Sequence, residues 1–253
     1  MELVKSGVKA LIQKQRDPIL FLIQHLNAGL RKLSALTHKA QLYCQWAVKP
    51  NPEWFDHFID QHYQWSATKN PLGWERGIFS LLAVKQDATI LEICCGDGFN
   101  AHHFYAIRAK KIISVDFDPK AIKHASKNFK SDKIEYRLCD IRQSLPQGTF
   151  TNIIWDAAIE HFTLEEMDNI FKGILQRLTK DGILSGYTNA KAEYGASHDD
   201  HEHEFESKEE LKLKLKQYFT HVVVFDTQYP DRHNLYFFAS NEPMQFLADF
   251  KEN

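Results

Sequence analysis

Acidic residues follow several short apolar runs of the chain, and the first of them stands beside two glycines. Glu92 lies near the end of the apolar segment 88–93, and Gly96 and Gly98 follow shortly after it. Asp116 ends the next apolar run, about 20 residues after the glycines. Glycines let the backbone approach a ligand closely, and a carboxylate at this spacing can accept hydrogen bonds from both hydroxyls of a ribose. The pattern therefore predicts a loop that binds a nucleoside.

The later apolar runs end in further groups that could do chemistry. Asp140 follows the third run, Asp156 ends the fourth, and Glu160 and His161 come just after it. A neutral imidazole can remove a proton near neutral pH, so His161 is our first candidate for a general base, with Glu160 beside it. In the alternative interpretation, Glu160 and His161 only cap or orient the loop that follows.

Strand-like and helical runs alternate from residue 88 onward. We expect strands at 88–93, 111–116, 133–138, 150–156, 182–188, 220–226 and 234–239, and helices at 98–109, 118–129, 164–178 and 207–218. This alternation predicts an α/β fold, a Rossmann-like three-layer sandwich with a seven-stranded, mostly parallel sheet. The last two strands, joined by a Pro-Asp turn, are expected to form a C-terminal antiparallel pair. Ligands bind such sheets at the carboxyl ends of the strands, so the carboxylates should converge there.

The order of these motifs resembles that of the class I S-adenosylmethionine (SAM)-dependent methyltransferases over residues 88–240. The likeness rests on the segments Glu92–Gly98, Ile153–Phe162 and Leu178–Leu184, together with Asp116 and Asp140. It implies SAM as the cofactor, with Asp116 on the ribose and Asp140 on the adenine. The implied cofactor-binding residues are Glu92, Cys94, Gly96, Gly98, Asp116, Phe117, Asp140, Ile141 and Asp156. The family usually has glycine where this chain has Cys94, so the contact made there differs.

The acceptor side of the site is expected to involve aromatic and histidine side chains. The implied substrate-binding residues are Tyr63, Trp74, His201 and His203. Tyr63 and Trp74 belong to an aromatic-rich stretch that could form a lid, or could simply pack in the core. The cluster 198–207 could contact the acceptor, form a solvated loop or bind a metal. With Glu160 and His161 it loosely resembles the metal site of small-RNA 2′-O-methyltransferases, but that family's extra glutamate falls at Ala157, so we assign no metal ligand.

Composition limits the other classes of function. The chain has 253 residues and a net charge of −2, so no overall basic field recruits nucleic acid. Its four cysteines lack zinc-type spacing, no signal peptide is visible, and no apolar run is long enough to span a bilayer; we expect reduced thiols and a cytoplasmic location. We divide the chain into a helical extension (1–50), an aromatic-rich helical lid or cap (51–87), the SAM-binding domain (88–240) and a tail (241–253).

The first 50 residues are basic and read as one or two amphipathic helices. They could pack on the main domain, support a homodimer, or lie on an anionic membrane surface. For the whole chain we expect methyl transfer from SAM to a small-molecule or sugar- or lipid-linked acceptor. The alternatives are metal-assisted RNA methylation, a SAM-binding regulator without catalysis, and an NAD-dependent oxidoreductase. The last is favoured by a G-x-G-x-x-A match at 96–101, but Glu92 would repel a pyrophosphate, whereas it suits an ammonium group.

Overall fold

The computed structural model describes residues 16–47, 65, 69, 71–191, 200–230 and 232–250. The chain divides into two compact units. The first comprises Met1–Glu53 and Phe58–Ala67, and the second comprises Trp54–His57 and Thr68–Asn253. The predicted site residues of the sheet domain therefore all fall in the second unit.

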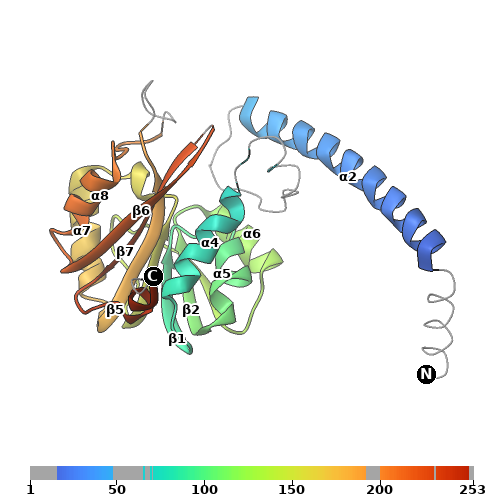
Figure 1. Cartoon of the computed structure of the whole chain (residues 1–253). Coiled ribbons are helices and arrows are strands. Elements are labelled where there is room, and N and C mark those ends of the chain that lie inside the picture. The colour runs from blue at the N-terminus through green and yellow to red at the C-terminus, as the bar shows by residue number, and fades with distance from the viewer. Residues whose placement is uncertain are drawn as a thin grey trace. The chain divides into compact units, whose positions relative to one another are not determined.

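A seven-stranded sheet forms the centre of the second unit (Figure 1). Its strands are β1 (Ala88–Ile93), β2 (Ala109–Asp116), β3 (Ile134–Leu138), β4 (Phe150–Asp156), β5 (Leu178–Asn189), β6 (His221–Tyr229) and β7 (Arg232–Ser240). Their spatial order is β3-β2-β1-β4-β5-β7-β6. Strands β1 to β5 pair in parallel, whereas β7 runs antiparallel to both β5 and β6. The predicted sheet and its terminal antiparallel pair are confirmed.

The direction of winding reverses between β1 and β4. From β1 the chain goes first to β2 and β3 on one side, and then crosses over to β4 and β5 on the other. In open α/β sheets such a reversal leaves a crevice at the carboxyl ends of the two central strands. The loops that carry the predicted site residues leave the sheet at this same edge.

Helices cover both faces of the sheet, as Figure 1 shows for α7 and α8 on one side and α4 to α6 on the other. They are α4 (Leu72–Ala83), α5 (Phe99–His103), α6 (Pro119–Asn128), α7 (Leu164–Leu175) and α8 (Lys208–Leu215), with short 3-10 turns η1 (Tyr105–Ile107), η2 (Ile159–His161) and η3 (Gln245–Phe250). One apolar cluster lies under α7 and α8, and a second contains residues of α4 and α5 together with Phe129, the C-cap of α6. The central strands are apolar almost throughout because both of their faces are covered.

Local sequence signals explain where several helices begin. Pro119 occupies the first turn of α6, whose N-cap Asp118 accepts a hydrogen bond from the backbone N–H of Lys120. Thr163 and Glu166 form a capping box at the start of α7. At α8, Ser207 caps the backbone of Glu210 as the sequence suggests.

The helix expected over 98–109 is shorter than predicted. It ends at His103, and after Phe104 the chain forms the turn η1 before β2 begins at Ala109. The break turns the ring of Tyr105 into the core, where its hydroxyl bonds to a carboxylate described below. This long-range contact outweighs the helical periodicity of the segment.

The first unit contains α2 (Arg16–Ala47), a single helix of 32 residues where one or two were expected. Apolar side chains along it are exposed, among them Leu22, Leu26, Leu30, Leu33 and Leu36. No helix among the described residues has the length and apolar character needed to cross a membrane. The partner of this basic extension, whether a domain, a subunit or a lipid surface, stays a prediction.

Candidate active site

The glycine loop connects β1 to α5 at the carboxyl edge of the sheet. Its backbone enters the left-handed region at Cys94 (φ 57°), Gly96 (φ 53°) and Gly98 (φ 80°). Gly98 is also the N-cap of α5, and a Cβ placed on it would lie 2.8 Å from both Ala125 Cβ and Tyr136 Cε1. The conformation and the close packing both require glycine at this position.

We expect Gly98→Ala to lower the free energy of unfolding by about 2–4 kcal/mol, because left-handed strain adds to overpacking against two side chains. Urea denaturation followed by near-UV circular dichroism measures the change. Gly29→Ala is the matched control, since a Cβ at Gly29 meets nothing within 4 Å. An unfolding midpoint of Gly98→Ala equal to that of the wild type would contradict the described loop geometry.

Asp116 holds the glycine loop from the end of β2. Its Oδ2 accepts a hydrogen bond from the backbone N–H of Gly96 at 2.9 Å, and its Oδ1 accepts one from Asp118 N–H at 2.9 Å. Burial nevertheless raises the pKa of Asp116, and its two backbone hydrogen bonds only partly offset the increase. Each carboxylate oxygen keeps a second lone pair, so both oxygens can still accept a hydroxyl proton of a ribose.

Glu92 lies on β1, directly below the loop, and is 2% exposed. Its Oε2 accepts a hydrogen bond of 2.7 Å from the hydroxyl of Ser114 on β2. Burial, with smaller contributions from Asp156, Asp97 and Asp116, raises the pKa of Glu92 to about 8. A buried carboxyl group surrounded by other acids gains most from the arrival of a cation.

Asp140 lies farther along the same edge and is paired with Arg142. The guanidinium donates from Nε to Oδ1 at 2.9 Å and from Nη2 to Oδ2 at 2.8 Å, and this pairing lowers the pKa of Asp140. The same guanidinium lies 5.6 Å from the centre of the Phe117 ring, which is exposed. Ile141 is buried in the core. Arg142 thus links the Asp140 carboxylate to the ring of Phe117 at this edge.

Cys94 is the first residue of the glycine loop after β1. Burial raises the pKa of its thiol well above the usual range, and Asp116, Glu160 and Asp140 add to the effect. A thiol in this setting stays protonated, so Cys94 fits an inert packing role better than a nucleophilic one. Asp116, Asp140 and Glu160, which come from the ends of β2, β3 and β4 or just beyond them, thus all act electrostatically on this one loop.

Asp156, at the end of β4, is held by two residues that the sequence does not single out. Its Oδ2 accepts hydrogen bonds from Asn100 Nδ2 at 3.2 Å and from the hydroxyl of Tyr105 at 3.0 Å. Both partners come from the segment after the glycine loop, so Asp156 ties that segment to β4. A role of Asp156 toward the cofactor stays a prediction.

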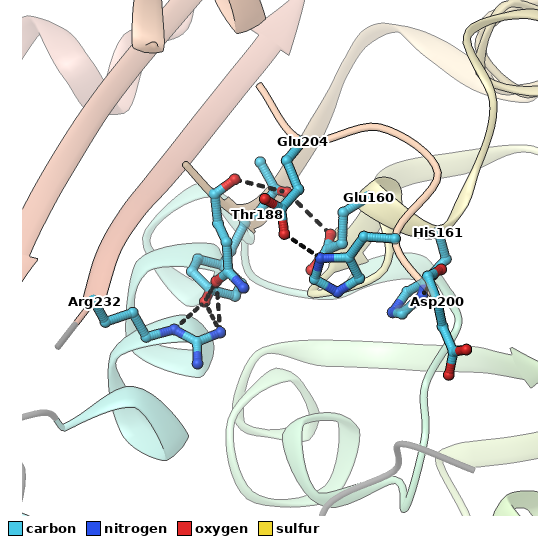
Figure 2. A network of polar contacts seen from close by, with 9 residues as sticks. Glu160, His161, Thr188, Asp200, Glu204 and Arg232 are labelled. Atoms are coloured by element: carbon cyan, nitrogen blue, oxygen red, sulfur yellow. Dashed lines mark hydrogen bonds and ion pairs between the residues drawn. The ribbon is translucent and has the colours of Figure 1, made fainter. Parts of the chain in front are cut away.

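Glu160 and His161 form the turn η2 beyond β4, and the segment 200–204 folds against them (Figure 2). The backbone carbonyl of Glu160 accepts hydrogen bonds from the N–H groups of Glu202 and His203, at 2.9 and 3.1 Å. The Glu160 side chain is 3% exposed, and its Oε2 accepts a bond from the hydroxyl of Thr188, at the end of β5. The predicted catalytic residues and the histidine segment are therefore brought together.

Histidine side chains of the two segments meet in this region. The rings of His161 and His201 lie edge to face with centroids 4.8 Å apart. His161 Nδ1 bonds to the backbone carbonyl of Asp200 at 3.1 Å, and His201 Nδ1 bonds to the Glu204 carboxylate. His203 instead points to Glu210, with 3.4 Å between Nε2 and Oε1. Of the two histidines predicted to contact substrate, His201 thus lies in the group around Glu160.

A second polar network lies beside this group and was not predicted. Figure 2 shows Arg232 approaching from β7. Its guanidinium donates to the hydroxyl of Tyr187, with Nε at 2.9 Å, and to Oδ1 of Asn189 and Asn234. Tyr187 and Asn189 stand at the carboxyl end of β5, which was the one available signal. The contact with Arg232 spans more than 40 residues and leaves no local pattern.

The aromatic candidates are placed only in part. Trp74 lies on α4, is 49% exposed, and its ring contacts Phe104. Another part of α4 packs on the sheet through Phe79, whose ring meets Tyr236 of β7. Tyr63, like His198, lies outside the described residues, so its predicted contact stays open, as do the domain boundaries expected around residues 51–87.

Part of the chain matches a known protein family. Residues 90–182 match the family model described as a methyltransferase domain. This domain belongs to the class I SAM-dependent methyltransferases. The match covers β1 to the start of β5, which includes the glycine loop, Asp116, Asp140 and the pair Glu160–His161.

Sequence similarity to curated relatives extends over only part of the chain. Ribosomal protein L11 methyltransferase of Vibrio cholerae serotype O1 (strain M66-2) is 30% identical over 113 residues, 42% of this chain and 37% of that protein. The enzyme of the same name from Aquifex aeolicus (strain VF5) is 24% identical over 108 residues, 43% and 42% of the two chains. The chain thus spans about two fifths of the length of these relatives.

Solved structures support the same fold over more of the chain. N-methyltransferase NodS from Bradyrhizobium japonicum WM9, in complex with S-adenosyl-L-homocysteine, superposes with a TM-score of 0.58 at 20% identity, covering 74% of this chain and 95% of that one. TehB from Haemophilus influenzae gives a TM-score of 0.55 at 14% identity, covering 72% and 67%. At such identities the likeness concerns the fold of the methyltransferase.

Proposed function

We propose that this methyltransferase transfers a methyl group from SAM to a small-molecule or sugar- or lipid-linked acceptor. The observation that carries the proposal is the position of Asp116, which holds the glycine loop while keeping a lone pair on each oxygen for a ribose hydroxyl. Glu92 below the loop suits the ammonium of the methionine part. Phe117 and Asp140 suit a purine, whose ring stacks on an aromatic face and whose amino group needs an acceptor.

Methyl transfer from a sulfonium needs mainly alignment and exclusion of water, because the methyl group is already activated. A group that handles the acceptor's proton is needed only when that proton must leave. Glu160 and His161 follow β4 next to the glycine loop, and from this position they can act on the acceptor's proton. A neutral imidazole can accept the proton directly, and an ion bound by the same imidazole can instead make the acceptor more acidic.

The acceptor class is open to several alternatives. The similar proteins include enzymes whose names specify a ribosomal protein and one that is named an N-methyltransferase. A net charge of −2 argues against a chain that recruits nucleic acid by its overall field. RNA methylation is the second candidate, favoured by the Glu160–His161–His201 group. A SAM-binding regulator without turnover is the third, and it would bind SAM but transfer nothing.

Labelled methyl transfer tests the proposal. The protein is incubated with SAM carrying a radioactive methyl group and with the small-molecule, RNA and protein fractions of a cell extract. We expect label in the small-molecule fraction, and loss of at least about 100-fold of the rate in His161→Ala, since removing the group that handles the acceptor's proton typically costs that much. Label that enters RNA or protein instead would overturn the acceptor class, and label in no fraction despite SAM binding would favour the regulator.

A further inference from the structure

Glu160, His161 and His201 form a compact group of potential metal ligands at the carboxyl edge. One side-chain nitrogen or oxygen from each lies within 4.8 Å of the other two. Two atoms bonded to one ion at about 2.1 Å each can lie up to about 4.2 Å apart. Small side-chain rotations therefore suffice to bring all three atoms onto one ion.

The hydrogen bonds of the two imidazoles fix their tautomers. A backbone carbonyl can only accept, so His161 Nδ1 must donate its proton to Asp200. His201 Nδ1 likewise donates to the Glu204 carboxylate. Each neutral ring then carries its lone pair on Nε2. Such an outer bond from Nδ1 to a carbonyl or carboxylate is the arrangement that normally orients metal-binding histidines.

Burial and charge point the same way. The side chains of His201 and Glu204 are each 2% exposed, and Glu160 is 3% exposed. Buried carboxylates are costly unless a charge or a metal compensates them. A dication offsets the negative charges of the Glu160 and Glu204 carboxylates, while the Thr188 hydroxyl donates a hydrogen bond to Glu160 Oε2.

We propose that Glu160, His161 and His201 bind a divalent transition-metal ion at the acceptor end of the site, with Glu204 orienting His201. The missing carboxylate at Ala157 does not prevent this, because three protein ligands with an open position are typical of catalytic metal sites. Two imidazoles and one carboxylate select Zn²⁺, Co²⁺ or Mn²⁺ over Mg²⁺, which prefers oxygen ligands.

The metal site also limits the chemical class of the methyl acceptor, and this step rests on the proposed methyl transfer. A hydroxyl oxygen on the open position of the ion becomes more acidic and releases its proton to solvent. The oxygen then bonds to the methyl carbon as the carbon–sulfur bond breaks, and the sulfur keeps the electron pair. The acceptor class is therefore an alcohol or a sugar hydroxyl.

Metal titration of the full chain, free of any affinity tag and stripped with EDTA, tests the site. Calorimetry is expected to give one Zn²⁺ per chain with micromolar or tighter affinity, and Co²⁺ to give visible absorption bands. We expect His201→Ala to weaken Zn²⁺ binding by at least about 100-fold and Glu204→Gln by about 10–100-fold. Mg²⁺ is expected to bind at least about 100-fold more weakly than Zn²⁺.

His203→Ala is the matched control, because His203 lies in the same segment but points to Glu210. Its Zn²⁺ affinity should stay within about threefold of the wild type. Circular dichroism shows that each variant is folded, and His161→Ala replaces His201→Ala if the latter is not. Equal Zn²⁺ affinity of the wild type and the folded ligand variant would overturn the metal site. Zn²⁺ binding without SAM binding would overturn the methyltransferase proposal alone, and SAM binding without Zn²⁺ binding the metal site alone.

Discussion

Asp116→Asn is expected to weaken SAM binding by about 100-fold. The substitution removes the charge that strengthens hydrogen bonds to two ribose hydroxyls, and such bonds contribute about 1.5–3 kcal/mol each. Asp116 now accepts hydrogen bonds from the backbone N–H groups of Gly96 and Asp118, and asparagine would place its own NH₂ against one of these two donors. Calorimetry with SAM measures the change, and NADH is titrated in parallel.

Asp118→Asn is the control for this prediction. It removes the same charge two residues away, and asparagine serves as an N-cap for α6 about as well as aspartate. We expect its SAM affinity to remain within about threefold of the wild type. If folded Asp116→Asn binds SAM like the wild type, the ribose assignment is wrong. If the wild type binds NADH but not SAM, the result would instead favour the function of an NAD-dependent oxidoreductase.

Glu92→Gln should change stability and SAM affinity in opposite directions. The pKa of Glu92 is raised by burial from 4.5 to about 8 in the folded protein. The folded state therefore holds this proton more tightly than the unfolded state, and wild-type stability falls as the pH rises from about 5 to about 8. Glutamine has no proton to lose in this pH range. The free energy of unfolding of the variant therefore rises relative to that of the wild type by up to about 1.4 kcal/mol per pH unit in that window.

Urea denaturation of the ligand-free protein between about pH 5 and about pH 9 measures the first effect. The second effect is a loss of SAM affinity, because the ammonium loses its negative partner. Near neutral pH the wild-type Glu92 must release its proton as the ammonium binds, so the heat of SAM binding depends on the buffer, whereas that of Glu92→Gln does not. The exposed Glu135 gives the control Glu135→Gln. Parallel stability curves for wild type and Glu92→Gln would contradict the raised pKa.

The fold was predictable because its signals are local. Apolar runs with the right length and turn residues between them fix the strands, and the parallel sheet brings their carboxyl ends to one edge. Glu92, Asp116 and Asp140 could be placed there from position alone. The start of α6 at Asp118 and Pro119 and the Ser207 cap of α8 likewise depend on a few neighbouring residues.

The partners of these residues could not be predicted. Tyr105 reaches Asp156, and Arg232 reaches Tyr187, across 40 residues or more of chain, and neither contact leaves a periodic pattern. The pairing of Arg142 with Asp140 depends on side-chain rotamers rather than on spacing. The sequence predicts no metal ligand, because Ala157 stands where the small-RNA family has a further glutamate. The meeting of His161 with His201 and Glu204 depends on how residues 200–204 fold against η2.

The segment that follows β5 completes the edge on which the chemistry is proposed. The match to the methyltransferase family ends at residue 182, before Thr188, His201, Glu204 and Arg232. This edge of the sheet thus has two halves encoded in consecutive stretches of chain, joined by the backbone bonds between Glu160 and residues 202–203. The later stretch can diversify toward new acceptors while the earlier one continues to recognise the same methyl donor, which explains why homology identifies the donor and leaves the recipient to be found by experiment.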